Sequence, residues 1–169
     1  EAKSFLDVGT GSGVIALTLA LKKTEARVVA CDLSPQALAL AGENRARHGL
    51  ESRVELIESN LLSSVQGAFD AVVANLPYIP TAEISGLARE VLQDPVSALD
   101  GGEDGLRLIE HLADQLPTHL APGGLVALEI GHDQSEKVIS LLKERGFQEA
   151  SAHSDYQGRL RFVSARRWL

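Results

Sequence analysis

A tetrapeptide near the middle of the chain combines three groups suited to holding a planar NH₂ group. It reads Asn75-Leu76-Pro77-Tyr78 and follows the apolar segment 69–74. The asparagine supplies an oxygen that accepts hydrogen bonds, the proline restricts the residue before it, and the tyrosine supplies a flat face. An amide nitrogen is a poor nucleophile because its lone pair is delocalised, so its orientation matters greatly. We therefore predict a methyl-acceptor site at these four residues.

A glycine-rich turn near the start of the chain is the second candidate site. The run Gly9-Thr10-Gly11-Ser12-Gly13 separates a short apolar segment from one of helical composition. At such a turn the glycines permit close approach of a ligand, and we expect the backbone N–H groups to point outward. The glycine spacing differs from the dinucleotide fingerprint, and no lysine follows as in a P-loop. The pattern therefore disfavours NAD and triphosphates.

Polar residues after the next two predicted strands extend this site. Asp32 stands about twenty residues beyond the glycine turn, where a carboxylate can accept both hydroxyls of a ribose. Ser34 supplies the cap of the following helix, so Asp32 is not needed for that role. Asn60 is expected to face an adenine edge, with Leu61 and Leu62 as apolar contacts, although a plain turn role for Asn60 stays open.

The elements that must position these residues alternate between strands and helices. Strands are predicted at residues 3–8, 27–31, 54–57, 69–74, 125–130, 147–153 and 159–165. Helices are predicted at residues 14–22, 35–48, 106–120 and 134–145, with a short one around 82–92 in a long loop, 76–104. This order predicts an α/β fold with a mostly parallel, doubly wound sheet of about seven strands. The last two strands break the alternation and form an antiparallel hairpin at one edge.

Composition restricts the classes of protein. A chain of 169 residues with 44% apolar content fits one domain with a real core. It has no apolar run of the ~20 residues that span a bilayer, and the net charge of −7 repels phosphate backbones. Cys31 is the single cysteine, which excludes a metal site built from several cysteines. We expect a cytoplasmic monomer that binds no metal, membrane or nucleic acid.

These motifs together resemble the class I S-adenosylmethionine-dependent methyltransferases, and most closely the HemK/PrmC family of protein-(glutamine-N5) methyltransferases, which act on peptide chain release factors. The resemblance spans essentially the whole chain. It rests on Asp7-Val8-Gly9-Thr10-Gly11-Ser12-Gly13, Asp32 to Leu38, Asn75 to Pro80, Asp94-Pro95, Ala98 to Leu106, Pro122-Gly123-Gly124, Glu129-Ile130-Gly131 with Gln134, and Asp155-Tyr156 with Gly158 and Arg161. The family usually has proline where Leu76 stands and Asp where Asn60 stands.

The resemblance implies a function and a set of site residues. The chain would bind S-adenosylmethionine and transfer its methyl group to the glutamine of a Gly-Gly-Gln loop in a release factor. The implied catalytic residues are Asn75, Leu76, Pro77 and Tyr78, with the Asn75 side-chain oxygen and the Leu76 carbonyl accepting the two amide hydrogens. The implied cofactor-binding residues are Asp7, Gly9, Thr10, Gly11, Ser12, Gly13, Asp32, Leu33, Asn60, Leu61 and Asn75.

Two alternatives remain open. Asn-Leu-Pro-Tyr also looks like the signature of ribosomal RNA adenine dimethyltransferases, so an adenine-N6 methyltransferase on RNA or DNA is the closest competitor. The chain begins at Glu1, almost on the first strand. It is therefore expected to be an excised catalytic domain without the family's N-terminal helical domain. The second alternative is that this domain binds cofactor with little or no turnover in isolation.

Outside the two sites we expect structural roles. Asp155, Gly158 and Arg161 are predicted to hold the last hairpin together through a turn and an ion pair. The side chains of His111, His119, His132 and His153 are predicted to lie on the surface or to pack, with no role as a base. Glu129 matches a family position, but the sequence assigns it no role.

Overall fold

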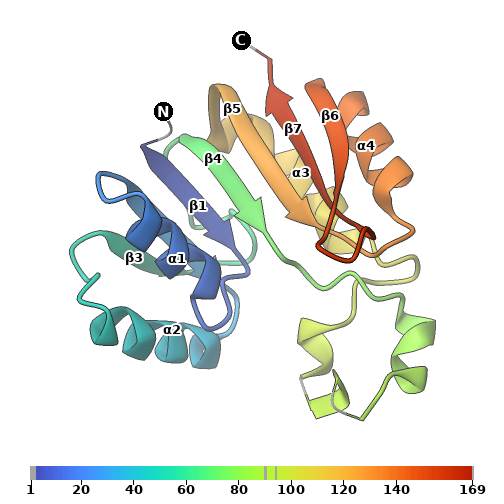
Figure 1. The fold of residues 1–169 in the computed structure, drawn as a ribbon, viewed down its shortest axis with the longest axis horizontal. Helices are drawn as coiled ribbons and strands as arrows, with labels where there is room; N and C mark the ends of the chain where they lie inside the picture. Colours follow the sequence, from blue (N-terminus) through green and yellow to red (C-terminus); the bar gives the residue numbers. More distant parts are fainter. Residues whose placement is uncertain (1–2, 90, 94, 169) are drawn as a thin grey trace.

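The computed structural model describes residues 3–89, 91–93 and 95–168, so Glu1 and Asp94 lie outside the described residues. Its centre is a seven-stranded sheet in the order β3-β2-β1-β4-β5-β7-β6 (Figure 1). The strands are β1 (Ser4–Val8), β2 (Arg27–Asp32), β3 (Val54–Glu58), β4 (Phe69–Ala74), β5 (Leu120–Glu129), β6 (Phe147–Ser154) and β7 (Leu160–Arg167). Neighbours from β3 to β5 are parallel, and β7 is antiparallel to both β5 and β6. The predicted fold class is confirmed.

Helices cover both faces of the sheet. They are α1 (Val14–Lys22), α2 (Pro35–Arg47), α3 (Arg107–His119) and α4 (Ser135–Glu144). Buried residues of α1 share one apolar core with β1 and β2, whereas those of α3 and α4 share a second core with β4 and β5. Figure 1 shows α1 in front of the sheet with α3 and α4 behind it. None of the helices in the described part of the chain is long and apolar enough to cross a bilayer.

Local sequence signals explain where several elements begin. The Ser34 hydroxyl accepts a hydrogen bond from the Ala37 amide (3.2 Å), so the predicted cap of α2 is confirmed.

The predicted start of β5 at residue 125 is wrong. The strand begins at Leu120, which pairs with Phe69 before a shift in register. The glycines before residue 125 therefore form an irregularity within the strand rather than a turn ahead of it.

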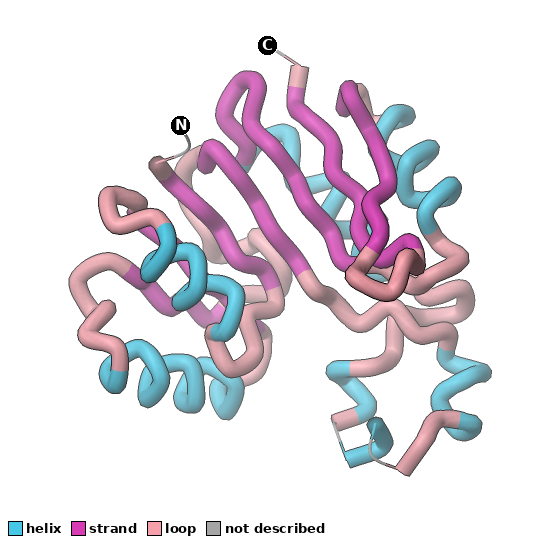
Figure 2. The backbone as a smooth tube through the Cα atoms, viewed as in Figure 1, coloured by secondary structure: helices cyan, strands magenta, loops and turns pink. Residues whose placement is uncertain are grey.

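The segment after β4 forms a lobe that projects from the sheet (Figures 1 and 2). The predicted single helix around 82–92 is wrong, since the lobe contains three short 3₁₀ turns, η1 (Thr81–Gly86), η2 (Val91–Gln93) and η3 (Val96–Ala98). Prolines directly before η1 and η3 and a glycine at the end of η1 leave no segment long enough for a stable helix. The root of the lobe is closed by two hydrogen bonds, from the Ile79 amide to the Leu99 carbonyl (3.1 Å) and from the Gly101 amide to the Ile79 carbonyl (2.9 Å).

Candidate active site

The glycine turn between β1 and α1 is fixed by hydrogen bonds to β2. The amides of Gly9 and Thr10 both donate to the Cys31 carbonyl (2.9 and 3.0 Å), and the Gly13 amide donates to the Thr10 carbonyl (2.9 Å). The Gly11 amide donates to Asp32 Oδ2 (2.8 Å). The expectation of outward N–H groups is therefore wrong for these four amides. The turn offers a ligand close approach rather than a row of anion-binding donors, which suits a ligand without phosphates.

The glycines of this turn have distinct structural roles. Gly9, Gly11 and Gly13 all have positive φ values (70°, 56° and 84°). A methyl group on Gly9 would lie 2.9 Å from Leu76 Cδ2, and one on Gly13 would lie 3.2 Å from Ala41 Cβ, whereas one on Gly11 would meet nothing within 4 Å. Gly11 is therefore the residue of the turn that faces open space, and Gly9 is packed against the end of β4.

Asp7 supports the turn from beneath. Its side chain is completely buried, and Oδ2 accepts hydrogen bonds from the Thr10 hydroxyl (2.7 Å) and the Ala16 amide (3.0 Å). Oδ1 is buried without a hydrogen-bond partner among the described residues. Burial raises the pKa of Asp7 from 3.8 to about 6, although the Thr10 hydroxyl and the Ala16 amide act against that shift. Asp7 thus contributes to the site by holding the shape of the turn.

The carboxylate of Asp32 is only partly available to a ligand. Oδ2 accepts from the Gly11 amide, and Oδ1 accepts from the Ser34 amide (2.9 Å). Asp32 therefore has a turn role that the sequence did not predict. Each carboxylate oxygen has two lone pairs, and the residue is half-buried, so one acceptor direction per oxygen remains for hydroxyl groups.

Residues next to Asp32 frame an open surface. Leu33 is 65% exposed and Asn60 is exposed, whereas Leu61 and Leu62 are buried, at 9% and 1% exposed. Beside Asp32, Leu33 therefore exposes more apolar surface than Leu61 or Leu62. The remaining predicted loop residue, Ser12, accepts a hydrogen bond on its carbonyl from Asn44 Nδ2 (3.0 Å), which ties the turn to α2.

The acceptor tetrapeptide begins where β4 ends, directly beside the glycine turn. β1 and β4 are parallel neighbours with Val8 opposite Ala74, so Gly9 and Asn75 are the next residues on each strand. A methyl group on Gly9 would lie 3.7 Å from the Asn75 carbonyl oxygen. The Asn75 side chain is exposed, and no hydrogen bond joins its carboxamide to a described residue. The structure thus brings the two predicted sites together.

The tetrapeptide is anchored by Leu76 and Tyr78. Leu76 is 5% exposed and lies in the core, so its side chain has a packing role that the sequence did not predict. The half-buried Tyr78 donates its phenol proton to Glu129 Oε1 (3.3 Å) and accepts from Arg161 Nη1 (3.2 Å). Burial raises the pKa of Tyr78, the Glu129 carboxylate raises it further, and Arg161 opposes the shift. Pro77, between these two anchors, is half-buried.

Of the two predictions about the last hairpin, the structure confirms the turn and contradicts the ion pair. The turn is confirmed, because the Asp155 carboxylate accepts from the Gln157 and Arg159 amides (2.8 and 3.0 Å). The predicted ion pair is wrong, since Arg161 instead contacts the Tyr78 phenol. The side chains that hold Tyr78 come from elements far away in the sequence. Only the order of strands β4-β5-β7 reveals that they meet.

The histidines and Cys31 have surface or packing environments. Three of the four histidines considered are exposed, and His119 interacts with the Gln115 and Val65 carbonyls (2.9 and 3.1 Å). Cys31 is buried, with its thiol donating to the Leu61 carbonyl (3.4 Å) and its pKa raised by burial to about 12. The positions of the histidines agree with the predicted surface or packing roles.

A hollow of about 550 Å³ lies at the opposite edge of the sheet. Its lining includes Ser4, Arg27 and Phe69, which stand at the starts of strands β1, β2 and β4. Asn75 and the glycine turn lie at the carboxyl ends of the strands, where open α/β sheets bind ligands. This hollow is therefore separate from the candidate site.

The family of the chain follows from its sequence. Residues 1–113, more than half of the chain, match the family described as "Methyltransferase small domain". The chain belongs to this family. The candidate site at the carboxyl ends of the strands therefore lies in a methyltransferase fold. Solved structures also confirm the predicted fold class.

Curated relatives agree with the resemblance seen in the motifs. A protein of Moorella thermoacetica is 46% identical over 170 residues, covering 99% of this chain and 60% of the relative. A protein of Deinococcus radiodurans is 42% identical over 167 residues, covering 99% of this chain and 59% of the relative. Both are named release factor glutamine methyltransferase. The chain thus spans about 60% of the length of these relatives.

Solved structures share the fold. The ribosomal protein L11 methylase of Lactobacillus delbrueckii subsp. bulgaricus superposes with a TM-score of 0.73 at 27% identity, covering the whole of this chain and 72% of that one. A methyltransferase of Pyrococcus furiosus gives a TM-score of 0.71 at 22% identity, covering 99% of this chain and 76% of that one, which shows the fold alone.

Proposed function

We propose that this domain transfers a methyl group from S-adenosylmethionine to the side-chain amide nitrogen of glutamine in the Gly-Gly-Gln loop of a peptide chain release factor. The observation that carries the proposal is that the backbone of the exposed residue Asn75 lies directly beside Gly9 of the glycine turn. The names of the curated relatives support the choice of a glutamine acceptor.

The residues of the glycine turn fit this cofactor. S-adenosylmethionine has a nucleoside but no phosphate, and the four turn amides that donate within the protein leave little for a phosphate to bind. The remaining lone pairs of Asp32 would accept the ribose hydroxyls. Leu33 and Asn60 would flank the adenine, and the open space at Gly11 would let the ligand approach the backbone.

The acceptor residues would act by orienting the amide. When bound, S-adenosylmethionine supplies an electrophilic methyl group on a positively charged sulfur. The Asn75 side-chain oxygen and the Leu76 carbonyl would accept the two N–H hydrogens of the glutamine, which aims its nitrogen at that methyl group. The same oxygens would stabilise positive charge that develops on the nitrogen. Pro77 would restrict Leu76 to extended geometry, and Tyr78 would lie against the planar amide.

No general base is needed before the transfer in this proposal. The amide nitrogen becomes acidic once it is alkylated, so its proton leaves readily to water. The positions of the histidines agree with this, because three are exposed and His119 is engaged by backbone carbonyls.

We further propose that residues 1–169 form a single methyl-transfer domain that works as a monomer in the cytoplasm. The side chains that the proposed transfer uses lie between Asp7 and Tyr78, so the proposal needs no second copy of the chain, and release factors act in the cytoplasm. The net charge of −7 supports a protein rather than a nucleic-acid partner.

Mass-spectrometric mapping of methyl groups tests the proposal. The chain is incubated with S-adenosylmethionine and one of three acceptors: a release factor, the same factor with Gly-Gly-Ala in its loop, or an adenine-containing RNA. We expect one methyl group on the loop glutamine and none on the other two acceptors. Methylated RNA would support the adenine alternative. Cofactor binding by titration calorimetry without transfer to any acceptor would support a domain that binds but does not turn over.

A further inference from the structure

Tyr78 is held at both ends by residues that the proposed chemistry does not use. At its backbone, Gln134 Nε2 donates to the Tyr78 carbonyl (2.9 Å), and Gln134 Oε1 accepts from the Gly131 amide (2.8 Å). Gln134 is only 5% exposed. A methyl group on Gly105 would lie 2.2 Å from the Tyr78 carbonyl oxygen, so this contact depends on a glycine there. The backbone of Tyr78 is therefore tightly enclosed.

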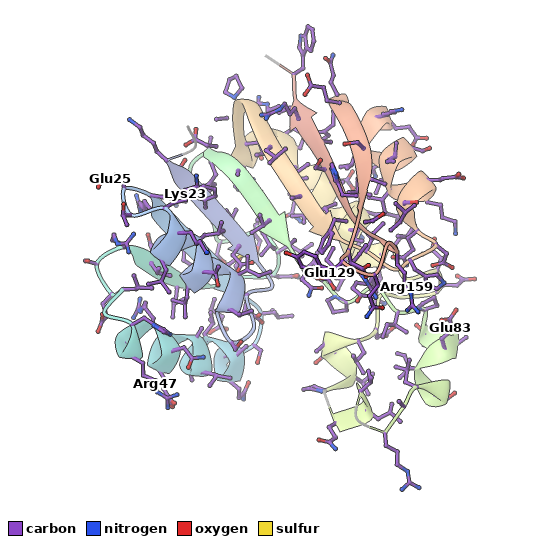
Figure 3. All side chains as sticks on the ribbon, in the orientation of Figure 1. Lys23, Glu25, Arg47, Glu83, Glu129 and Arg159 are labelled. Atoms are coloured by element: carbon purple, nitrogen blue, oxygen red, sulfur yellow. The ribbon has the colours of Figure 1, made fainter. Side chains whose placement is uncertain are left out.

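The phenol end of Tyr78 bridges two charged side chains. Glu129 ends β5 and accepts the phenol proton, while Arg161 of β7 donates to the phenol oxygen. Figure 3 shows Glu129 at the carboxyl ends of the strands, close to the turn of the last hairpin. Because Leu128 is opposite Ala74, Glu129 and Asn75 are the next residues on adjacent strands. The charged pair thus stands at the level of the acceptor site.

This arrangement fixes a segment that the sheet alone leaves free. β4 ends at Ala74, so the tetrapeptide has no strand ladder to hold it. A site of this kind needs its groups held to within about 0.5 Å, which requires supporting contacts on each side. Leu76 anchors one side through the core, and Tyr78 is the anchor on the other.

We infer that Glu129, Gln134 and Arg161 are positioning residues that fix Tyr78 and, through it, the Leu76 carbonyl and the Asn75 carboxamide for methyl transfer. The inference rests on the proposed function for its kinetic consequence. None of the three residues is required to touch the acceptor or the cofactor.

A double-mutant cycle tests the phenol contacts. Glu129→Gln replaces a charged acceptor by a neutral one, and we expect kcat for transfer to the Gly-Gly-Gln protein to fall about tenfold. The affinity for S-adenosylmethionine should stay within a factor of two or so, because the glycine turn is untouched. In a Tyr78→Phe background the phenol is absent, so Glu129→Gln should have no further effect. A full additional loss there would overturn the inference.

The ionisation of Tyr78 gives a readout that does not depend on activity. The chain has two tyrosines, and Tyr156 is fully exposed, so Tyr156→Phe isolates the signal of Tyr78. In that background Glu129→Gln should lower the pKa of Tyr78 and Arg161→Met should raise it, as seen by ultraviolet absorbance during a pH titration. Arg166→Met is the matched control, because Arg166 also lies on β7 but donates to the Gly123 carbonyl (2.9 Å). It should change neither the pKa of Tyr78 nor kcat.

The outcomes separate the two proposals. An unchanged pKa of Tyr78 in both Glu129→Gln and Arg161→Met would overturn the network. An active wild-type chain whose kcat is unaffected by Glu129→Gln would overturn only the positioning role. A wild-type chain that methylates no Gly-Gly-Gln protein would overturn the proposed function and the positioning role with it.

Discussion

The cofactor side and the acceptor side of the site are built in opposite ways. On the cofactor side, Asp7 contacts Thr10 and Ala16, residues three and nine positions away. On the acceptor side, Tyr78 contacts Gln134 and Arg161, which are 56 and 83 positions away. The first side is also tied to β2 and α2 through Cys31, Asp32 and Asn44, so the hydrogen bonds that fix it lie within residues 7–44. The second is assembled only when β4, β5 and β7 come together.

This contrast separates binding from catalysis. In the proposed function the glycine turn and Asp32 would hold the nucleoside through hydrogen bonds within the amino-terminal part of the chain, whereas the acceptor residues also depend on β5 and β7. Substitutions on the acceptor side should therefore reduce transfer while sparing cofactor affinity, and substitutions on the cofactor side should do the reverse.

The largest effect on methyl transfer is expected from Asn75→Ala. Removal of the carboxamide leaves the acceptor amide without one of its two hydrogen-bond acceptors, so kcat should fall by about 10²–10³-fold, or roughly 3–4 kcal/mol. Cofactor affinity, measured by titration calorimetry, should change by less than about tenfold, or ~1.4 kcal/mol. Gln66→Ala, an exposed side chain at the opposite edge of the sheet, is the control. Loss of cofactor binding in Asn75→Ala would remove the distinction between the two sides.

Leu76→Ala should lower the stability of the fold as well as the rate of methyl transfer. The side chain is 5% exposed and packs toward Gly9, so truncation should lower the free energy of unfolding by about 2–5 kcal/mol. Urea denaturation measures the change. Leu40→Ala, at a residue of α2 that is 46% exposed, should cost much less. Equal losses of stability in the two variants would contradict the buried packing of Leu76 against Gly9.

The raised pKa of Asp7 should make the stability of the fold depend on pH. Its pKa is about 6 in the folded chain against an ordinary 3.8, so the folded state binds more protons than the unfolded state between these values. Its contribution is therefore fully present below pH 3.8 and is lost as the pH rises through 6, about 3 kcal/mol in all. The free energy of unfolding of wild type minus that of Asp7→Asn should fall by most of this amount from pH 4 to pH 7. Asp70 and Asp100, whose pKa values are lowered, cancel in this difference. Parallel pH profiles would show that Asp7 is not buried in this way.

The smallest expected effect is that of Asp32→Ala on cofactor affinity. The variant should bind S-adenosylmethionine about 10–100-fold more weakly, or ~1.4–2.7 kcal/mol. Because Asp32 also holds the Gly11 amide, a cofactor analogue without a ribose 2′-hydroxyl separates the two causes. Wild type should bind the analogue more weakly than the cofactor, and Asp32→Ala should bind both equally. Unchanged affinity in Asp32→Ala would refute the ribose assignment.

The sequence predicts the order of the elements better than the contacts between them, for physical reasons. Regular alternation of apolar runs and helix caps, such as Ser34, is a local signal, so the element order and the position of Asn75 directly after a strand could be predicted. Hydrogen bonds of turn amides are not visible in residue types, and the internal bonds of the glycine turn were missed for that reason. The partner of Arg161 depends on the antiparallel register of β5 and β7, which no short motif specifies. The lobe after β4 forms short 3₁₀ turns rather than the predicted helix, because prolines directly precede η1 and η3.

A crystal structure of the chain with S-adenosylhomocysteine and a Gly-Gly-Gln peptide would test the central claim most directly. The quantity to measure is the pair of distances from the glutamine amide nitrogen to Asn75 Oδ1 and to the Leu76 carbonyl oxygen. We predict that both lie within about 2.7–3.2 Å. A glutamine amide bound with neither oxygen within about 3.5 Å would contradict the proposed orientation of the acceptor.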